Sequence, residues 1–226
     1  MSLRDVMAVV SMLALGACEI PQAPPVESPV TRPDQILDFS LLYAENCAGC
    51  HGRDGKGGLA LALSDPVYLA IADDATIRAA TAKGVAGTTM PAFAQSSGGA
   101  LTDRQIDSIV SGLRTRWARP DALGGATPPP YAADTPGDAA SGAIVYGTWC
   151  SSCHGPSGRG GGRAGSIVDP SYLGLVSDQG LRTTVIAGRR DLGSPDWRDD
   201  VPGKPMSAEN VSDVVVWLTA QRARGE

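Results

Sequence analysis

Cys47-Ala48-Gly49-Cys50-His51 decides the fold of this chain, and the same pattern returns as Cys150-Ser151-Ser152-Cys153-His154. Two thiols separated by two residues, with a histidine directly after the second, fit thioether bonds to the two vinyl groups of a haem with the imidazole beneath the iron. The short spacing forces the histidine under the ring that its neighbours have bonded. The motifs therefore predict two haem c groups, attached through Cys47, Cys50, Cys150 and Cys153 and ligated by His51 and His154.

Zinc binding and thiol redox chemistry fit the two motifs less well. A zinc site needs four ligands, whereas each motif offers two cysteines and one histidine, and His51 and His154 are the only histidines of the chain. A thioredoxin-like thiol pair would lie in a βαβ context, of which the sequence shows no sign. A chance occurrence of C-x-x-C-H is the third alternative, and haem attachment is favoured over all three.

Length, composition and charge limit the class of protein. The 226 residues give room for two small domains. Aromatic residues make up 5% of the chain, which suits domains whose largest apolar body is a porphyrin. The net charge of −5 and the lack of a Lys- and Arg-rich stripe argue against nucleic-acid binding. A redox protein that docks to this acidic surface is expected to present basic residues.

The fifth cysteine, Cys18, follows an N-terminal segment of a targeting type. The apolar run over residues 6–15 is too short to span a bilayer. Leu15-Gly16-Ala17-Cys18 resembles a bacterial lipobox, whose cysteine is diacylated and becomes the new N-terminus. We therefore expect residues 1–17 to be a lipoprotein signal peptide and Cys18 to anchor the protein to a membrane, in the bacterial periplasm or cell envelope. A plain secretory signal with an incidental cysteine is the alternative.

Proline-rich segments divide the chain into domains. We expect a tether over residues 18–33, a linker over 120–134, and two haem domains over 34–119 and 135–226. The two domains resemble each other along their length. Matched pairs are Tyr43 and Tyr146 at a separation of 103, Pro91 and Pro195 at 104, and Leu113 and Leu218 at 105. Two single-residue insertions over a whole domain indicate one fold that has been duplicated.

Each half is expected to contain the same succession of helices. A first helix leads into the haem motif, a glycine-rich loop follows, and a short helix begins near residue 74 or 178. The last helix begins at Thr102-Asp103 in the first half and at Ser207-Ala208-Glu209 in the second, where cap-type residues precede apolar residues at helical spacing.

The glycine-rich loops, residues 52–58 and 155–165, lack the Gly-Lys-Ser/Thr of a phosphate-binding loop. We expect them to wrap the haem edge, where glycine allows tight turns. One backbone carbonyl in each loop is expected to accept the N–H of the ligating imidazole and so fix its orientation.

With these features, each half resembles a class I cytochrome c domain, over residues 34–119 and 135–224. The resemblance implies an all-α fold in which the N- and C-terminal helices of each domain cross beside the haem edge. At the matched crossing positions the first half has Phe39 and Gly112, and the second half has Gly142 and Trp217. We expect each pair to be in contact, so that each crossing holds one large and one absent side chain. In the alternative, Gly112 only lowers the stability of its helix, and Phe39 does not contact it.

The methionines decide the sixth iron ligand, because a His/Met pair raises the haem potential and suits electron transfer. Met90, in the segment 87–93, resembles the ligand loop of the family and is expected to bind the first iron. In the second half the matched position is Ser194, a poor iron ligand, and Met206 aligns with Leu101. Met206 is favoured as the second ligand, because no third histidine exists and its loop is one residue longer. In the alternative, Met206 is a hydrophobic staple and the second iron is open or bound by water.

Aromatic and arginine residues are candidates for further haem contacts. Trp197 matches Phe93 as an aromatic residue that packs on the haem. The candidate donors to haem propionates are Arg78 in the first half and Arg182, Arg189 and Arg190 in the second, with solvated surface charge as an equal alternative.

These features predict a dihaem electron carrier that is not an enzyme and has no catalytic residue. Single electrons would enter at one haem and leave by the other. The expected donor is a quinol-oxidising complex or a dehydrogenase, and the expected acceptor is an oxidase or another cytochrome. The alternative is a haem enzyme or a gas sensor that uses an open sixth position on the second haem. The lack of a spare histidine argues against the enzyme.

Overall fold

The computed structural model describes residues 31–161, 163–199 and 201–222. The chain divides into two units, Met1–Thr31 and Arg32–Glu226, and the second unit holds both haem motifs. The predicted signal peptide, Cys18 and residues 18–30 of the predicted tether lie outside the described residues. No helix in the described part of the chain is long and apolar enough to cross a membrane.

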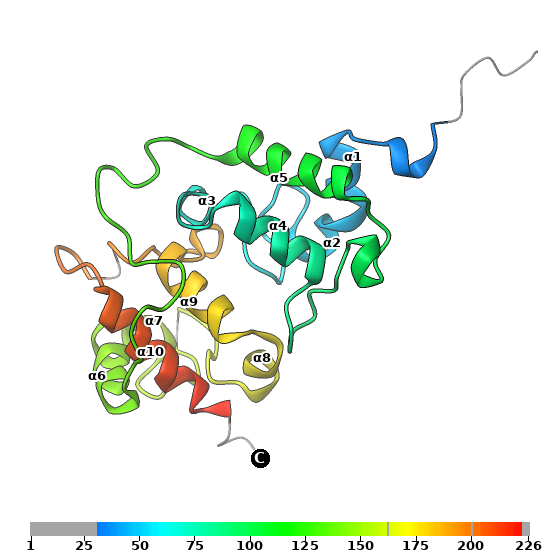
Figure 1. The fold of residues 1–226 in the computed structure, drawn as a ribbon. Coiled ribbons are helices and arrows are strands. Elements are labelled where there is room, and N and C mark those ends of the chain that lie inside the picture. The colour runs from blue at the N-terminus through cyan, green and yellow to red at the C-terminus, as the bar shows by residue number, and fades with distance from the viewer. Residues whose placement is uncertain (1–30, 162, 200, 223–226) are drawn as a thin grey trace, which may run out of the picture. The chain divides into compact units, whose positions relative to one another are not determined.

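The second unit is helical, and strand-like pairing among its described residues is limited to two isolated bridges. The first half contains α1 (Phe39–Asn46), α2 (Ala48–His51), α3 (Pro66–Ile71), α4 (Asp74–Lys83) and α5 (Asp103–Trp117). The second half repeats this order with α6 (Ala139–Trp149), α7 (Ser151–His154), α8 (Pro170–Leu175), α9 (Asp178–Ala187) and α10 (Ala208–Thr219). Three short 3₁₀ helices are η1 (Pro33–Gln35), η2 (Gln95–Ser97) and η3 (Arg190–Leu192). Helices α1–α5 lie together, as do α6–α10 (Figure 1), which confirms the prediction of an all-α fold.

Capping side chains fix where the helices begin. The helices α1, α3, α4 and α5 are capped by Asp38, Asp65, Asp73 and Thr102, and α6, α8, α9 and α10 by Asp138, Asp169, Ser177 and Ser207. Each side chain accepts a hydrogen bond from a backbone amide of the first turn that would otherwise be unpaired. The starts predicted for α4, α5, α9 and α10 are confirmed. The short helices α3 and α8 are not among the predicted elements, although each begins at the proline of an Asp-Pro pair, which is typical of a helix start.

The terminal helices of each half cross where a glycine faces a large side chain. A Cβ atom added to Gly112 of α5 would lie 2.7 Å from the Cβ of Phe39 in α1 and would overlap its ring. In the second half, a Cβ added to Gly142 of α6 would lie 2.7 Å from the Cβ of Trp217 in α10. Figure 1 shows α1 beside α5 and α6 beside α10. The predicted exchange of large and absent side chains between the two halves is confirmed.

We expect Gly142→Ala to destabilise the protein by about 1–3 kcal/mol, the usual cost of overpacking a tight contact. The added methyl group would also lie 2.7 Å from the carbonyl carbon of Asp213, which is backbone and cannot rotate away. Gly147 is the matched control, because it lies in the same helix and has nothing within 4 Å of an added Cβ. Gly147→Ala should raise stability by up to about 1 kcal/mol. Urea unfolding of the holoprotein measures both, and equal effects of the two variants would contradict the crossing.

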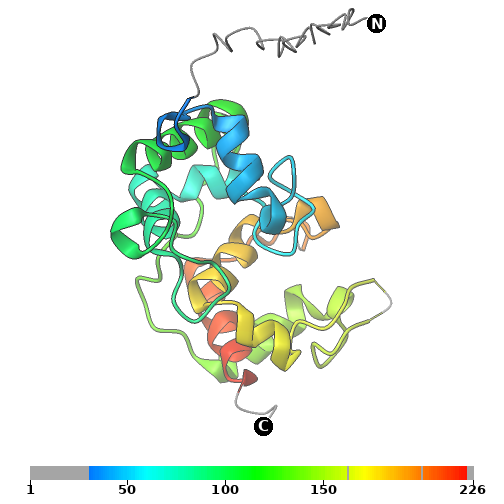
Figure 2. The same ribbon diagram turned by 90° about the vertical axis from the view of Figure 1, so that its right-hand side faces the viewer.

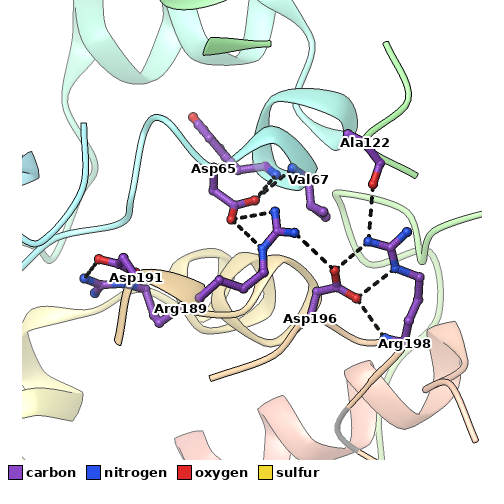
Figure 3. A network of polar contacts seen from close by, with 9 residues as sticks. Asp65, Val67, Ala122, Arg189, Asp191, Asp196 and Arg198 are labelled. Atoms are coloured by element: carbon purple, nitrogen blue, oxygen red, sulfur yellow. Dashed lines mark hydrogen bonds and ion pairs between the residues drawn. The ribbon is translucent and has the colours of Figure 1, made fainter. Parts of the chain in front are cut away.

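The two halves of the second unit are joined by a network around two buried carboxylates. Figure 2 shows the first half, from blue to green, above the second half, and α3 lies beside α9. Arg190 donates to Asp65 Oδ2 from Nε at 3.1 Å and from Nη2 at 2.9 Å. Its Nη1 lies 3.9 Å from Asp196 Oδ2, and Arg198 Nη2 donates to the same oxygen at 2.6 Å (Figure 3). Arg190 therefore links a carboxylate of each half.

A second set of contacts holds the loop that follows the first haem motif. Arg189 Nη2 donates to the carbonyl of Gly58 at 2.9 Å. The amide of Gly57 donates to Asp191 Oδ2 at 2.8 Å, and Arg189 pairs with the same carboxylate at 2.9 Å. The first haem loop thus rests on residues 189–191 of the second half.

The predicted linker is packed against α9. Arg182 Nε donates to the carbonyls of Pro130 and Tyr131 at 3.0 and 3.1 Å, and Gln179 Nε2 donates to Tyr131 at 2.8 Å. The side chain of Arg182 is buried, and burial lowers the pKa of its guanidinium below the ordinary value. Residues 130 and 131 of the predicted linker are therefore held to the second half by two side chains of α9.

Candidate haem sites

The haem motifs begin where the first helix of each half ends. The amide of Cys47 donates to Tyr43 at 2.9 Å, and that of Cys150 donates to Tyr146 at 2.9 Å, so the chain turns without a break into α2 and α7. Within each short helix the histidine amide donates back to the first cysteine at 3.0 Å. One turn of helix therefore places two thiols and an imidazole together in each half, as the motif predicts.

Both tyrosines that precede the motifs bond to the loops that follow them. Tyr43 donates from its hydroxyl to the carbonyl of Gly52 at 2.9 Å, and Tyr146 donates to that of Gly155. Gly52 and Gly155 have φ angles of +81° and +77°, in the left-handed region that glycine adopts readily. These bonds fix the start of each glycine-rich loop directly after the histidine.

A backbone carbonyl orients each imidazole, as expected. Nδ1 of His51 lies 2.7 Å from the carbonyl oxygen of Leu61, and Nδ1 of His154 lies 2.8 Å from that of Gly165. A carbonyl oxygen only accepts, so Nδ1 carries a proton in both rings, which leaves Nε2 as the nitrogen that could bind a metal. Gly165 lies within the predicted loop, whereas Leu61 lies three residues beyond its predicted end.

The geometry of His51 fits a haem iron. Its Nε2 is buried and has no hydrogen-bond partner in the described part of the chain, which is costly for a polar atom unless something else binds it. Burial lowers the pKa of His51, with a further lowering by the charge of Arg189, against a rise from the bond to Leu61. The ring is therefore neutral at pH 7, which is the form that ligates a metal.

The segments predicted to carry the sixth ligands fold alike in the two halves. The amide of Val85 donates to the carbonyl of Met90 at 3.1 Å, and the amide of Arg189 donates to that of Ser194 at 3.1 Å. A Cβ added to Gly84 would lie 2.7 Å from the carbonyl oxygen of Met90, and one added to Gly188 would lie 2.8 Å from that of Ser194. Ser194 therefore has the position that Met90 has in the first half.

Met206 lies where the first half has Leu101. The amide of Leu101 donates to the carbonyl of Phe93 at 2.7 Å, and the amide of Met206 donates to that of Trp197 at 2.9 Å. Both side chains are buried, with 5% and 3% of their surface exposed. Each also precedes the cap of the last helix. These contacts are those expected if Met206 is a hydrophobic staple. The role of Met206 as an iron ligand stays a prediction.

The arginines predicted to serve the propionates have protein partners in the structure. Arg78 pairs with Asp103 and Asp107 at 2.8 and 2.7 Å on the surface. Arg182 binds the linker carbonyls, although its Nη2 is buried without a partner in the described part of the chain. Arg189 and Arg190 join the two halves. Contact of any of them with a propionate stays a prediction.

One pair of arginines that makes the same contacts in both halves was not predicted. Arg114 donates to the carbonyls of Leu69 and Ala72 and pairs with Asp74. Arg222 repeats these bonds in the second half with Leu173, Val176 and Asp178. Each arginine closes the C-terminal end of the short helix α3 or α8. Their separation of 108 residues differs from the 103 to 105 of the other matched pairs, which is why alignment of the halves does not reveal them.

Comparison with known proteins also finds the two similar halves. A family model described as "Cytochrome C oxidase, cbb3-type, subunit III" matches residues 35–111 and again residues 137–218. The Cbb3-type cytochrome c oxidase subunit CcoP of Azospirillum sp. (strain B510) is 33% identical over 152 residues, which are 60% of this chain and 46% of that protein. The subunit CcoP of Rhodobacter capsulatus is 36% identical over 76 residues, which are 31% of this chain and 25% of that protein.

The chain thus spans less than half of the length of these curated relatives. Among solved structures, a reducing HAO-like protein complex of Kuenenia stuttgartiensis aligns over 81% of this chain and 94% of that chain, with 18% identity and a TM-score of 0.47.

The two matches of one family model agree with the two motifs and with the repeated helices. Each half is a cytochrome c domain, and the protein binds two covalent haem c groups. Because the family model covers residues 35–111 and 137–218, well over half of the sequence, this chain belongs to the cytochrome family described as cytochrome c oxidase, cbb3-type, subunit III.

Proposed function

We propose that this protein transfers single electrons through its two haem groups between redox proteins of a respiratory chain. When bound, each haem supplies reversible one-electron chemistry at its iron. The observation that carries the proposal is the state of His51, whose Nδ1 is bonded to the carbonyl of Leu61 while its buried Nε2 has no partner in the described residues. A neutral, oriented nitrogen in an apolar site is what a haem iron requires of its protein.

The chain's own residues bind and orient the two groups. Cys47 and Cys50 hold the first haem and Cys150 and Cys153 the second, by thioether bonds. His51 and His154 ligate the irons, and Met90 is the sixth ligand of the first. No side chain is assigned a catalytic role.

The proposed partners are a quinol-oxidising complex or a dehydrogenase as donor and an oxidase or another cytochrome as acceptor. The match to CcoP subunits supports a cbb3-type oxidase as the acceptor, with this chain bound to it or exchanging electrons with it. The acidic net charge of −5 supports docking to basic surfaces on either partner.

We also place the protein at the membrane surface of the cell envelope, anchored through a lipid on Cys18. The support is the sequence before Cys18 alone. Labelled palmitate should be incorporated into the wild-type protein and not into Cys18→Ser, and equal labelling of the two would contradict the anchor.

Electron transfer is tested with the purified, fully reduced holoprotein in stopped-flow mixing. Membranes that contain a cbb3-type oxidase should reoxidise both haem groups, and cyanide should stop the reaction. The design needs no soluble mediator, so an added mediator serves only as a positive control for the oxidase. Reduced protein that stays reduced while the mediator is oxidised would contradict the proposed acceptor.

A further inference from the structure

We propose that the second haem iron receives no sixth ligand from this chain, and that in its reduced state it binds a small neutral diatomic molecule such as carbon monoxide beside Ser194. The inference rests on the haem attachment proposed for Cys150, Cys153 and His154. It goes beyond the proposed function, because electron transfer does not require a ligand that exchanges at the iron.

The first step is the position of Ser194. Its carbonyl accepts from the amide of Arg189 at 3.1 Å, and its amide donates to the carbonyl of Arg189 at 3.0 Å, so a two-bond bridge fixes the residue. The same place in the first half holds Met90. A hydroxyl is a hard and weak donor to haem iron, whereas a thioether is a soft one. Ser194 therefore occupies the backbone position that Met90 has in the first half, and its hydroxyl cannot replace a thioether as an iron ligand.

The second step is the restraint on Met206. Its amide is bonded to the carbonyl of Trp197 at 2.9 Å, and the next residue, Ser207, exchanges bonds of 3.0 and 3.1 Å with Asn210 in a capping box. Two residues earlier, the carbonyl of Lys204 accepts from the indole of Trp149 at 2.9 Å. The backbone is thus tied on both sides of Met206.

The third step concerns the extra residue of this loop. The sequence predicts that it lets Met206 reach the iron. In the structure the amide of Lys204 donates to the carbonyl of Val201 at 3.0 Å, so part of the longer loop forms a closed turn before Met206. Bringing Met206 to the place of Ser194 would break its bond to Trp197 and the anchor of Lys204 on Trp149. Each lost hydrogen bond of this kind costs about 0.5–1.5 kcal/mol.

Other ligands within reach are accounted for. The only histidines of the chain are the two in the haem motifs. The ammonium of Lys204 lies 4.7 Å from the centre of the Trp149 ring, in a cation–π contact. Nothing else in the described part of the second half is a strong neutral donor. A reduced haem with one axial imidazole and a free sixth position binds carbon monoxide, and the polarity around that position tunes the affinity.

The side chain of Ser194 suits such a ligand. Its hydroxyl makes no hydrogen bond within the described residues, and the residue is partly exposed. The hydroxyl can donate to the distal atom of a bound diatomic molecule. No electron or proton moves in this step, because carbon monoxide adds to the reduced iron through its own lone pair.

The experiment is a carbon monoxide titration of the reduced holoprotein, followed by absorption spectroscopy. In the wild type, one haem of the two should bind carbon monoxide. Ser194→Met should lower this number to none and give a second low-spin haem with a methionine-to-iron charge-transfer band. Met90→Ala should raise the number to two. Met206→Leu is the matched control and should leave the wild-type spectrum and titration unchanged.

Three results would overturn the inference. The first is a wild-type protein with two covalent haems that are both inert to carbon monoxide. The second is a Met206→Leu variant in which a haem newly loses its low-spin spectrum, which would make Met206 the ligand. The third is a Met90→Ala variant that still binds carbon monoxide at one haem, which would make the first haem the reactive one. A protein that carries no covalent haem would instead contradict the proposed function itself.

Discussion

Replacing Cys150 and Cys153 together by alanine is expected to remove about half of the covalently bound haem, because each motif attaches one group through its own two thioether bonds. The second half should then lose much of its stability, since the apolar contacts that the porphyrin would make are gone. Haem staining after denaturing electrophoresis and the pyridine haemochrome assay measure the haem bound per chain.

Three further variants separate the motifs from one another. Replacing Cys47 and Cys50 should remove the other half of the bound haem, and replacing all four cysteines should give a colourless protein. Cys18→Ser should leave the haem content unchanged, because Cys18 lies outside both haem domains. Retention of both groups after loss of either motif would contradict independent attachment.

The helix crossings could be predicted from the sequence because the duplication supplies an internal comparison. Phe39 and Gly112 in one half stand against Gly142 and Trp217 in the other, and only close approach of the helices explains why large and absent side chains change places together. Helix starts were predictable for a similar reason, since Thr102 and Ser207 are cap residues at matched positions.

The contacts between the halves could not be predicted in this way. Asp65 and Arg190 are 125 residues apart, and the Asp-Pro pair that contains Asp65 indicates a helix start and not a partner in the other half. Arg190 was considered only as a propionate donor, because sequence alone does not show which surfaces meet. The place of Met206 was equally open, since one added residue in a loop either extends its reach or closes a turn, and only the bonds of Lys204 decide between them.

Arg190→Ala is expected to destabilise the protein by about 1–3 kcal/mol, the cost of leaving a buried acceptor without its partner. The variant removes both bonds to Asp65, whose side chain is 7% exposed, and the weaker contact with Asp196, which is 2% exposed. Because Arg190 joins the two halves, they should also unfold in two separate steps in urea. The haem absorbance reports both steps.

Asp196 gives this network a dependence on pH. Burial of its carboxyl tends to raise the pKa, but the hydrogen bonds and charge of Arg198, with the charge of Arg190, outweigh burial and hold the pKa below its ordinary value. A lowered pKa means that the folded protein binds the proton less tightly than the unfolded chain. The stabilisation is therefore complete above the pKa of the unfolded aspartate, about 4, and is lost as the pH falls toward the folded value. Wild-type stability should decline below about pH 4, and Asp196→Asn should decline less.

Arg78→Ala is the matched control for Arg190→Ala. It also removes an arginine with two carboxylate partners, Asp103 and Asp107, but those carboxylates are 72% and 60% exposed. Solvated pairs of this kind contribute about 0–1 kcal/mol, so the control should unfold nearly as the wild type does. If both variants lose the same small amount and unfold in one step, burial of Asp65 and Asp196 does not hold the halves together. The two cytochrome domains would then be joined by the linker and by the contacts of Arg189 with Gly58 and Asp191.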